Sequence, residues 1–134
     1  MKRGFVASSF DLMHPGYILM LQDAKTVCDY LICGLHDDPT VDRPTKNKPI
    51  LTLEERKIVL SAVKYVDEII VYNTEVELKA LLKRIEPSVR ILGTDYRGKS
   101  FTGDDLHIPI HWHDRFHNWS TTSLKCRIQG VKLI

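Results

Sequence analysis

The 134-residue sequence lacks several features that would place it in a particular class of protein. No apolar run approaches the ~20 residues that a membrane-spanning helix needs, and the apolar stretch after Met1 is too short for a signal peptide. Lysine plus arginine (19) and aspartate plus glutamate (17) nearly balance, leaving a net charge of +2 that gives no support for bulk attraction to nucleic acid or membranes. We therefore expect a cytoplasmic protein without a nucleic-acid or membrane partner.

Cysteine is scarce, and internal repeats, low-complexity tracts and interdomain linkers are absent. Cys28, Cys33 and Cys126 form an odd set with no C-x-x-C spacing, which favours reduced thiols and places Cys28 and Cys33 in the expected core. The length is sufficient for one substantial core. We therefore expect residues 1–134 to form a single domain.

Short apolar runs alternate along the chain with segments of helical periodicity. Two T-x-x-E patterns, Thr52 with Glu55 and Thr74 with Glu77, are typical capping boxes at helix starts, and Ser120 precedes a third helix start. The expected strands lie at residues 4–7, 30–35, 69–71, 89–92 and 107–112. The expected helices begin at residues 15, 52, 74 and 121 and end near 28, 62, 86 and 129.

This order predicts a Rossmann-like α/β fold, a three-layer α/β/α sandwich with a five-stranded parallel sheet. Such sheets bind ligands beyond the carboxyl ends of their strands, where the strand order reverses. The functional residues should therefore lie in segments 8–16, 93–95 and 115–122 and in the loop that carries Lys46.

The segment SSFDLMHPGY (8–17) places His14 immediately before a helix. A helix N-terminus offers unpaired N–H groups and a partial positive charge, which suit a phosphate. His14 could hydrogen-bond a phosphoryl oxygen, Gly16 would let a ligand approach the backbone, and Asp11 could cap or orient its neighbours. The alternative is an ordinary helix start with a surface histidine.

Four motifs in register resemble the nucleotidyltransferase (cytidylyltransferase-like) superfamily over nearly the whole chain. The segment 8–17 is similar to the signature G-T-F-D-x-x-H-x-G-H. LEERK (53–57) with YVDEII (65–70) resembles the family's central helix and following strand, and LGTDY (92–96) resembles its L/M-G-x-D-aromatic turn. RFHNWSTT (115–122) resembles R-T-E-G-I-S-T-T of the glycerol-3-phosphate and phosphoethanolamine cytidylyltransferases.

The resemblance implies roles for individual residues. The implied catalytic residues are His14, Lys46 and Arg115. The implied nucleotide-binding residues are Ser8, Ser9, Phe10, His14, Gly16, Tyr17, Gly93, Asp95, Arg115, Ser120, Thr121 and Thr122. The implied acceptor-binding residues are Asp11, Lys46, Lys48 and Arg56, and the alignment does not choose between Lys46 and Lys48 for the loop lysine that neutralises phosphate charge. Lys79, on the third expected helix, could also reach the acceptor phosphate, and the alternative is a solvated helix lysine.

The resemblance also implies the reaction, in which an acceptor phosphate attacks the α-phosphate of a nucleoside triphosphate and pyrophosphate leaves. The expected donor is CTP and the expected acceptor a small phosphorylated alcohol such as glycerol-3-phosphate. ATP-using relatives that make ADP-sugars share S-T-T, so the base stays open. Mg²⁺ is expected with the triphosphate, no Asp cluster forms a dedicated metal cage, and a homodimer is expected because relatives are commonly dimers.

Three departures from the family pattern bear on activity. Ser8 and Asn118 stand where the family has glycine, and Tyr17 replaces the second signature histidine. A phenol can donate one hydrogen bond but cannot carry positive charge. An alternative function is therefore a nucleotide-binding, transferase-like module with weak or lost activity.

His111, His113 and Arg115 are spaced two residues apart, on one face of an expected strand. This spacing places only two metal ligands and identifies no carboxylate to complete a site. It favours substrate contact or an edge-strand surface over a metal centre.

Overall fold

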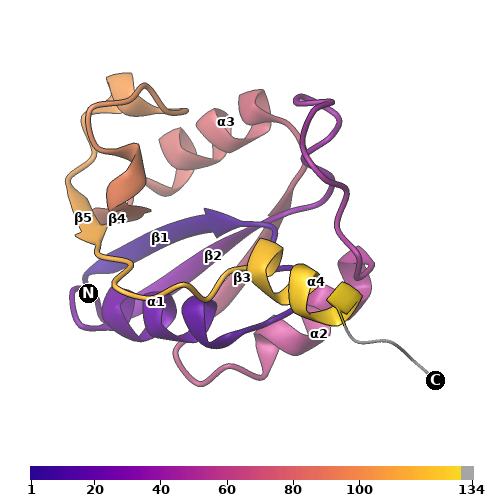
Figure 1. Ribbon diagram of the computed structural model, residues 1–134. Coiled ribbons are helices and arrows are strands. Elements are labelled where there is room, and N and C mark those ends of the chain that lie inside the picture. The colour runs from indigo at the N-terminus through magenta and orange to yellow at the C-terminus, as the bar shows by residue number, and fades with distance from the viewer. Residues whose placement is uncertain (131–134) are drawn as a thin grey trace.

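Five parallel strands form one sheet in the order β3-β2-β1-β4-β5 in the computed structural model, which describes residues 1–130 (Figure 1). The strands are β1 (Arg3–Ser8), β2 (Tyr30–His36), β3 (Glu68–Tyr72), β4 (Val89–Gly93) and β5 (Ile110–His113). The α-helices are α1 (Pro15–Lys25), α2 (Leu53–Ser61), α3 (Glu75–Ile85) and α4 (Thr121–Gly130). The expected Rossmann-like α/β sandwich with a five-stranded parallel sheet is confirmed.

Each face of the sheet carries its own apolar core. On one face Leu21 of α1 and Leu60 of α2 pack against the strands, and on the other face Leu78 and Leu82 of α3 do so. Figure 1 shows α3 on the side of the sheet opposite α1 and α2. Because the central strands are covered on both faces, they are continuous apolar runs in the sequence.

The helix starts follow the side-chain caps expected from the sequence, with one difference. Thr52 and Glu55 form the reciprocal capping box of α2. At α3 the Thr74 hydroxyl accepts from the Glu77 N–H at 3.1 Å, but the Glu77 carboxylate accepts from the N–H of Asn73 at 2.8 Å instead of from Thr74. The second capping box is therefore half formed.

Two expected boundaries are wrong by a few residues for identifiable reasons. Helix α1 ends at Lys25, and the chain turns through Thr26 before Cys28, which is buried in the core as expected, like Cys33. Strand β5 begins at Ile110, because His107 adopts a left-handed conformation (φ 55°) that breaks an extended strand.

The strand order reverses between β1 and β4, and these two strands pair over only two residues. All the strands are parallel, so their carboxyl ends meet at one edge of the sheet, where such folds open a crevice. Within residues 1–130, no helix has the length and apolar character needed to cross a bilayer.

Candidate functional site

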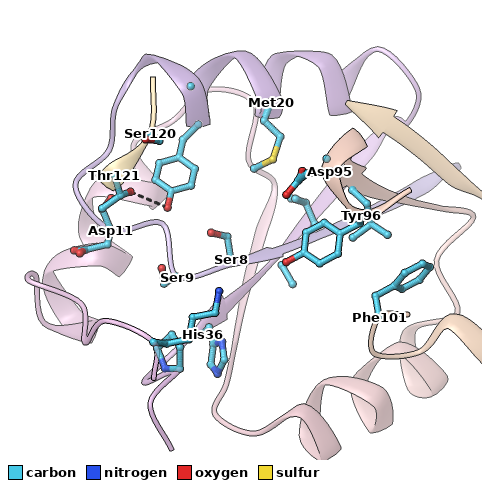
Figure 2. Close-up of a pocket in the computed structure, with 18 of the residues that line it drawn as sticks. Ser8, Ser9, Asp11, Met20, His36, Asp95, Tyr96, Phe101, Ser120 and Thr121 are labelled. Carbon is cyan, nitrogen blue, oxygen red and sulfur yellow. Dashed lines mark hydrogen bonds between the residues drawn. The ribbon is translucent and has the colours of Figure 1, made fainter. Parts of the chain in front are cut away.

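A cavity of about 710 Å³ lies at the carboxyl edge of the sheet, over the reversal of strand order (Figure 2). It gathers segments that are far apart in the sequence: the end of β1, the start of α1, the Lys46 loop, the end of β4 and the start of α4. The residues predicted from the sequence that line it are Ser8, Ser9, Asp11, His14, Gly16, Tyr17, Lys46, Gly93, Asp95, Arg115, Ser120, Thr121 and Thr122.

Four residues predicted for the site do not line this cavity. Phe10 is 1% exposed and packs in the core next to Tyr17. Lys48 lies outside the lining, whereas Lys46 is part of it, so the structure distinguishes the two loop lysines. Lys79 forms an ion pair with Asp105 at 2.8 Å on the surface of α3.

Arg56, the fourth of these residues, is 2% exposed, and backbone carbonyls accept from four of its five N–H groups. It donates to the carbonyl oxygens of Leu51 (3.1 Å), Ser9 (3.0 Å), His36 (2.6 Å) and Asp37 (2.6 Å). Arg56 therefore ties the ends of β1 and β2 to α2, and these carbonyls occupy the donors that an acceptor phosphate would need.

The Asp11 carboxylate also has a positioning role. It is 3% exposed and accepts the backbone N–H groups of Ile50 at 2.9 Å and Leu51 at 3.0 Å. These bonds anchor the far end of the loop that contains Lys46. Lys125 of α4 approaches the same carboxylate at 4.0 Å, so Asp11 links three of the segments around the cavity.

His14 is the N-cap of α1, and its tautomer follows from that position. Its Nδ1 accepts the Gly16 N–H at 3.1 Å, so in the neutral imidazole the proton is on Nε2. The ring stacks on Tyr17 with centroids 4.2 Å apart. His14 therefore presents a neutral N–H donor beside a helix N-terminus, an arrangement that suits a phosphoryl oxygen.

We expect the imidazole of His14 to titrate below pH 6.5 in the resting protein. Burial lowers the pKa of His14 from its ordinary value of 6.5, and electrostatic repulsion from Arg115 and, less strongly, from His117 acts in the same direction. Because the folded-state pKa is the lower one, the contribution of His14 to stability is complete above pH 6.5 and is lost as the pH falls below it. An NMR titration of the ring protons checks this, and a midpoint at or above 6.5 would contradict it.

The Tyr17 hydroxyl joins the starts of α1 and α4. It lies 3.2 Å from Thr121 Oγ1, which also bonds the carbonyl oxygen of Asp11 at 3.0 Å. A threonine hydroxyl has one proton, so when it donates to Asp11 the phenol must donate to Thr121. The ring of Tyr17 also packs against the apolar core.

The first turns of α1 and α4 meet in the cavity, and both present positive potential. A Cβ on Gly16 would lie 2.6 Å from the carbonyl oxygen of Trp119, so glycine allows this close approach. Ser120 caps α4 by accepting the Ser123 N–H at 3.0 Å. The side chains of Lys46, Arg115 and Lys125 add positive charge to the same lining.

Sequence reasoning missed the half of the cavity that lies toward α3. Figure 2 shows Tyr96 and Phe101 on the side opposite Ser120 and Thr121. The unpredicted lining residues in this half include His36, Arg43, Tyr72, Glu75, Arg90, Tyr96, Phe101 and Thr102. His36 and Tyr72 end strands, and Arg90 is a charged residue inside an apolar strand; these were the available signals.

The histidines of β5 have a carboxylate partner that the sequence spacing did not identify. Asp23 of α1 accepts from His111 Nε2 at 3.0 Å and from His113 Nδ1 at 2.7 Å. Burial acts to raise the pKa of Asp23, but the hydrogen bonds from the two histidines hold it below its ordinary value. In the described residues, no group of three or more His, Cys, Asp or Glu is arranged to hold a metal ion.

Comparisons with known sequences support one family. A family model described as cytidylyltransferase-like matches residues 5–126. The bifunctional protein HldE of Wolinella succinogenes is 36% identical over 127 residues, covering 94% of this chain and 27% of that protein. The bifunctional protein HldE of Campylobacter concisus is 32% identical over 129 residues, covering 96% and 27%. The chain thus spans about a quarter of the length of these curated relatives.

Solved structures share the fold. A lipopolysaccharide core biosynthesis protein from Thermoplasma volcanium superposes with a TM-score of 0.69 at 24% identity, covering 90% of this chain and 99% of that chain. A pantoate-beta-alanine ligase from Francisella tularensis, in complex with beta-gamma ATP and beta-alanine, superposes with a TM-score of 0.57 at 16% identity, covering 96% and 69%. At these identities the likeness concerns the fold alone.

Proposed function

Because this chain belongs to the cytidylyltransferase-like family of nucleotidyltransferases, we propose that it transfers a nucleoside monophosphate from a triphosphate to a small phosphorylated acceptor. The observation that carries this proposal is the convergence of two helix N-termini, His14, Lys46 and Arg115 on one cavity. Phosphoryl-type transfer depends mainly on positioning and charge neutralisation, and this arrangement offers both.

In the proposed reaction, a phosphate oxygen of the acceptor attacks the α-phosphorus of the triphosphate in line with the leaving group. The bond from the α-phosphorus to its bridging oxygen breaks, and pyrophosphate leaves. His14 Nε2 donates to an oxygen whose charge grows in the transition state. Arg115 and the start of α4 hold the departing phosphates, while Lys46 neutralises the incoming one.

Mg²⁺ fits this proposal as a counter-ion of the triphosphate. Mg²⁺ at such sites takes most of its ligands from phosphate oxygens and water, with one or two protein carboxylates. The Asp11 carboxylate is occupied by two backbone N–H groups, whereas Asp95 lines the cavity. Asp95 is therefore the residue we propose as its protein contact, and the ion would supply charge neutralisation.

Two donors and two acceptor classes deserve direct comparison. The late motif, RFHNWSTT, favours CTP with a glycerol-3-phosphate-like alcohol. ATP is the second candidate donor, because a protein of the same fold is known in complex with beta-gamma ATP. Sugar phosphates are the second acceptor class, because another protein of this fold is described as acting in lipopolysaccharide core biosynthesis.

The test is pyrophosphate release with CTP and ATP, each paired with glycerol-3-phosphate and with hexose 1-phosphates. Release that requires both a triphosphate and an acceptor is the expected result. Triphosphate binding by calorimetry without turnover for any pair, in folded protein, would support the alternative of a binding module that has lost activity.

Replacing Tyr17 by histidine should raise kcat about tenfold or more, because a second imidazole adds a donor that can carry positive charge. The Tyr17→Phe variant is the control, since it removes only the hydroxyl that bonds Thr121. It should lower the free energy of unfolding by about 0.5–1.5 kcal/mol. Initial rates and denaturant unfolding measure both effects, and a lower kcat in Tyr17→Phe and Tyr17→His alike would show that the phenol itself serves turnover.

A homodimer remains part of the proposal. Ile58 of α2 and Val71 of the edge strand β3 are exposed apolar residues that line one shallow hollow, and Val59 of α2 is exposed as well. A second copy of the chain that covers them would shield this edge. Light scattering on the purified protein should give twice the mass of one chain.

A further inference from the structure

Arg90 is a charged residue in the interior of the sheet. It lies in β4, paired with Phe5 of β1, and therefore faces α3. Its side chain reaches the cavity, although the residue is only 4% exposed. A guanidinium at such a position is costly to bury, and the burial lowers the pKa of Arg90.

The contacts of Arg90 leave most of its donors unused. Among the described residues its guanidinium makes one hydrogen bond, from Nη1 to the carbonyl oxygen of Thr102. In the same part of the chain no carboxylate oxygen lies within 4.0 Å of its nitrogens. A buried cation without an anionic partner is unfavourable unless a ligand supplies one.

The acidic side chain of α3 that acts on Arg90 is committed to other groups. Glu75 lies 3.4 Å from Arg43 through Oε1 and accepts from the Thr102 hydroxyl at 2.7 Å through Oε2. Its charge lowers the cost of burying Arg90, but it does not pair with the guanidinium. The Arg43 contact also ties the loop that carries Lys46 to α3.

The segment 101–103 covers Arg90 from the outside. The ring of Phe101 lies 5.3 Å from the guanidinium carbon. Gly103 has φ 81°, and a Cβ there would lie 2.8 Å from Leu82 and 3.2 Å from Arg90 Nη1. This segment covers the guanidinium on one side, and a charge-assisted hydrogen bond made in such a partly enclosed site is stronger than one made in open water.

Arg90 and the two helix N-termini lie on opposite sides of the sheet edge. His14 belongs to the α1 side, together with the start of α4, whereas Arg90 opens on the α3 side next to Tyr72. Resting on the proposed function, an acceptor whose phosphate lies at Lys46 would extend its other end along the α3 side.

We infer that Arg90 is a specificity-determining residue that binds a carboxylate at the end of the acceptor remote from its reacting phosphate. The unpaired N–H groups of the buried guanidinium would hold the carboxylate by bidentate hydrogen bonds. The acceptor class is therefore a phosphorylated hydroxy acid or sugar acid.

Two matched pairs of acceptors test the carboxylate. Glucuronate 1-phosphate is compared with glucose 1-phosphate, and 3-phosphoglycerate with glycerol-3-phosphate, using the wild-type protein and the better triphosphate. We expect the KM of the carboxylated member of at least one pair to be lower by about tenfold or more, as for one charge-assisted pair. Equal use of both members, or preference for the neutral member in both pairs, overturns the inference.

The Arg90→Met variant assigns the effect to this residue. It should abolish the preference for the carboxylated acceptor by raising the KM of that acceptor, while the KM of the triphosphate stays unchanged. Arg90→Lys should restore part of the preference. Arg84→Met removes an exposed arginine of α3 and should change nothing. A preference for the carboxylated acceptor that survives Arg90→Met also overturns the inference. The same holds if the preference is lost only because both Arg90 variants unfold.

Binding separates this inference from the proposed function. Calorimetry with each acceptor and a non-hydrolysable triphosphate measures the carboxylate preference without requiring turnover. If no acceptor is converted, yet glucuronate 1-phosphate binds about tenfold more tightly than glucose 1-phosphate in the wild type alone, the proposed reaction fails and the Arg90 site stands. If glucuronate 1-phosphate and glucose 1-phosphate bind equally and acceptors are converted at normal rates, the proposed reaction stands and the inference about Arg90 fails.

Discussion

His14→Asn is expected to lower kcat/KM by about 10²–10³ while the protein stays folded, the loss typical of one preorganised donor to developing charge. The substitution separates two roles of one side chain. Asparagine is a favoured N-cap and can accept the Gly16 N–H that Nδ1 of His14 now accepts. It cannot place a donor where the imidazole Nε2 lies, so the phosphate contact is lost together with the stacking of the ring on Tyr17, while the helix cap is kept.

The matched control is His107→Asn. His107 is exposed, lies outside the cavity lining and has φ 55°, a conformation that asparagine tolerates well. Initial rates and thermal unfolding should show no effect of this change. A kcat/KM for His14→Asn within about threefold of wild type, far below the loss that a missing oxyanion-type donor causes, would remove His14 from the chemistry.

Gly16→Ala is expected to abolish most activity and to lower the free energy of unfolding by about 1–3 kcal/mol, the usual cost of forcing a methyl group into a filled space. Its Cβ would lie 2.6 Å from the Trp119 carbonyl oxygen and 2.9 Å from the His14 ring. The backbone before α4 must then move away from α1. Alanine is otherwise the better helix former, so a loss of stability would report this contact.

Gly130→Ala is the corresponding control, because a Cβ at Gly130 meets no atom of the described residues within 4 Å. It should leave activity unchanged and stability equal or slightly higher. Denaturant unfolding and initial rates on both variants compare the two glycines directly. If Gly16→Ala proved as active and as stable as Gly130→Ala, the two helix starts would not be held together at this point.

The secondary structure was predictable because its signals are local. Apolar runs identified the five strands, and the side-chain oxygens of Thr52, Thr74 and Ser120 identified three helix starts. Boundaries were less predictable, since β5 starts late because of the conformation of His107. That conformation is set by the loop around it and leaves no clear mark in the sequence.

The cavity was predictable where its residues lie at strand ends and helix starts. Arg56 shows the limit of this reasoning, because its place in a family-like motif did not reveal that backbone carbonyls would occupy its guanidinium. The Asp23 partner of His111 and His113 is about 90 residues away in the sequence. Pairings over such separations depend on how α1 packs against β5.

The sequence by itself determined the family, the parallel α/β fold and the segments that meet at the carboxyl edge of the sheet, because periodicity, capping residues and four ordered motifs are properties of short stretches. Only the tertiary structure decided which side chains in those segments are free to meet a ligand. His14 is left with a free donor, and backbone groups occupy Asp11 and Arg56. Arg90 is buried without a carboxylate partner among residues 1–130. The physical reason is that a polar group's availability depends on its partners, and those come from distant parts of the chain.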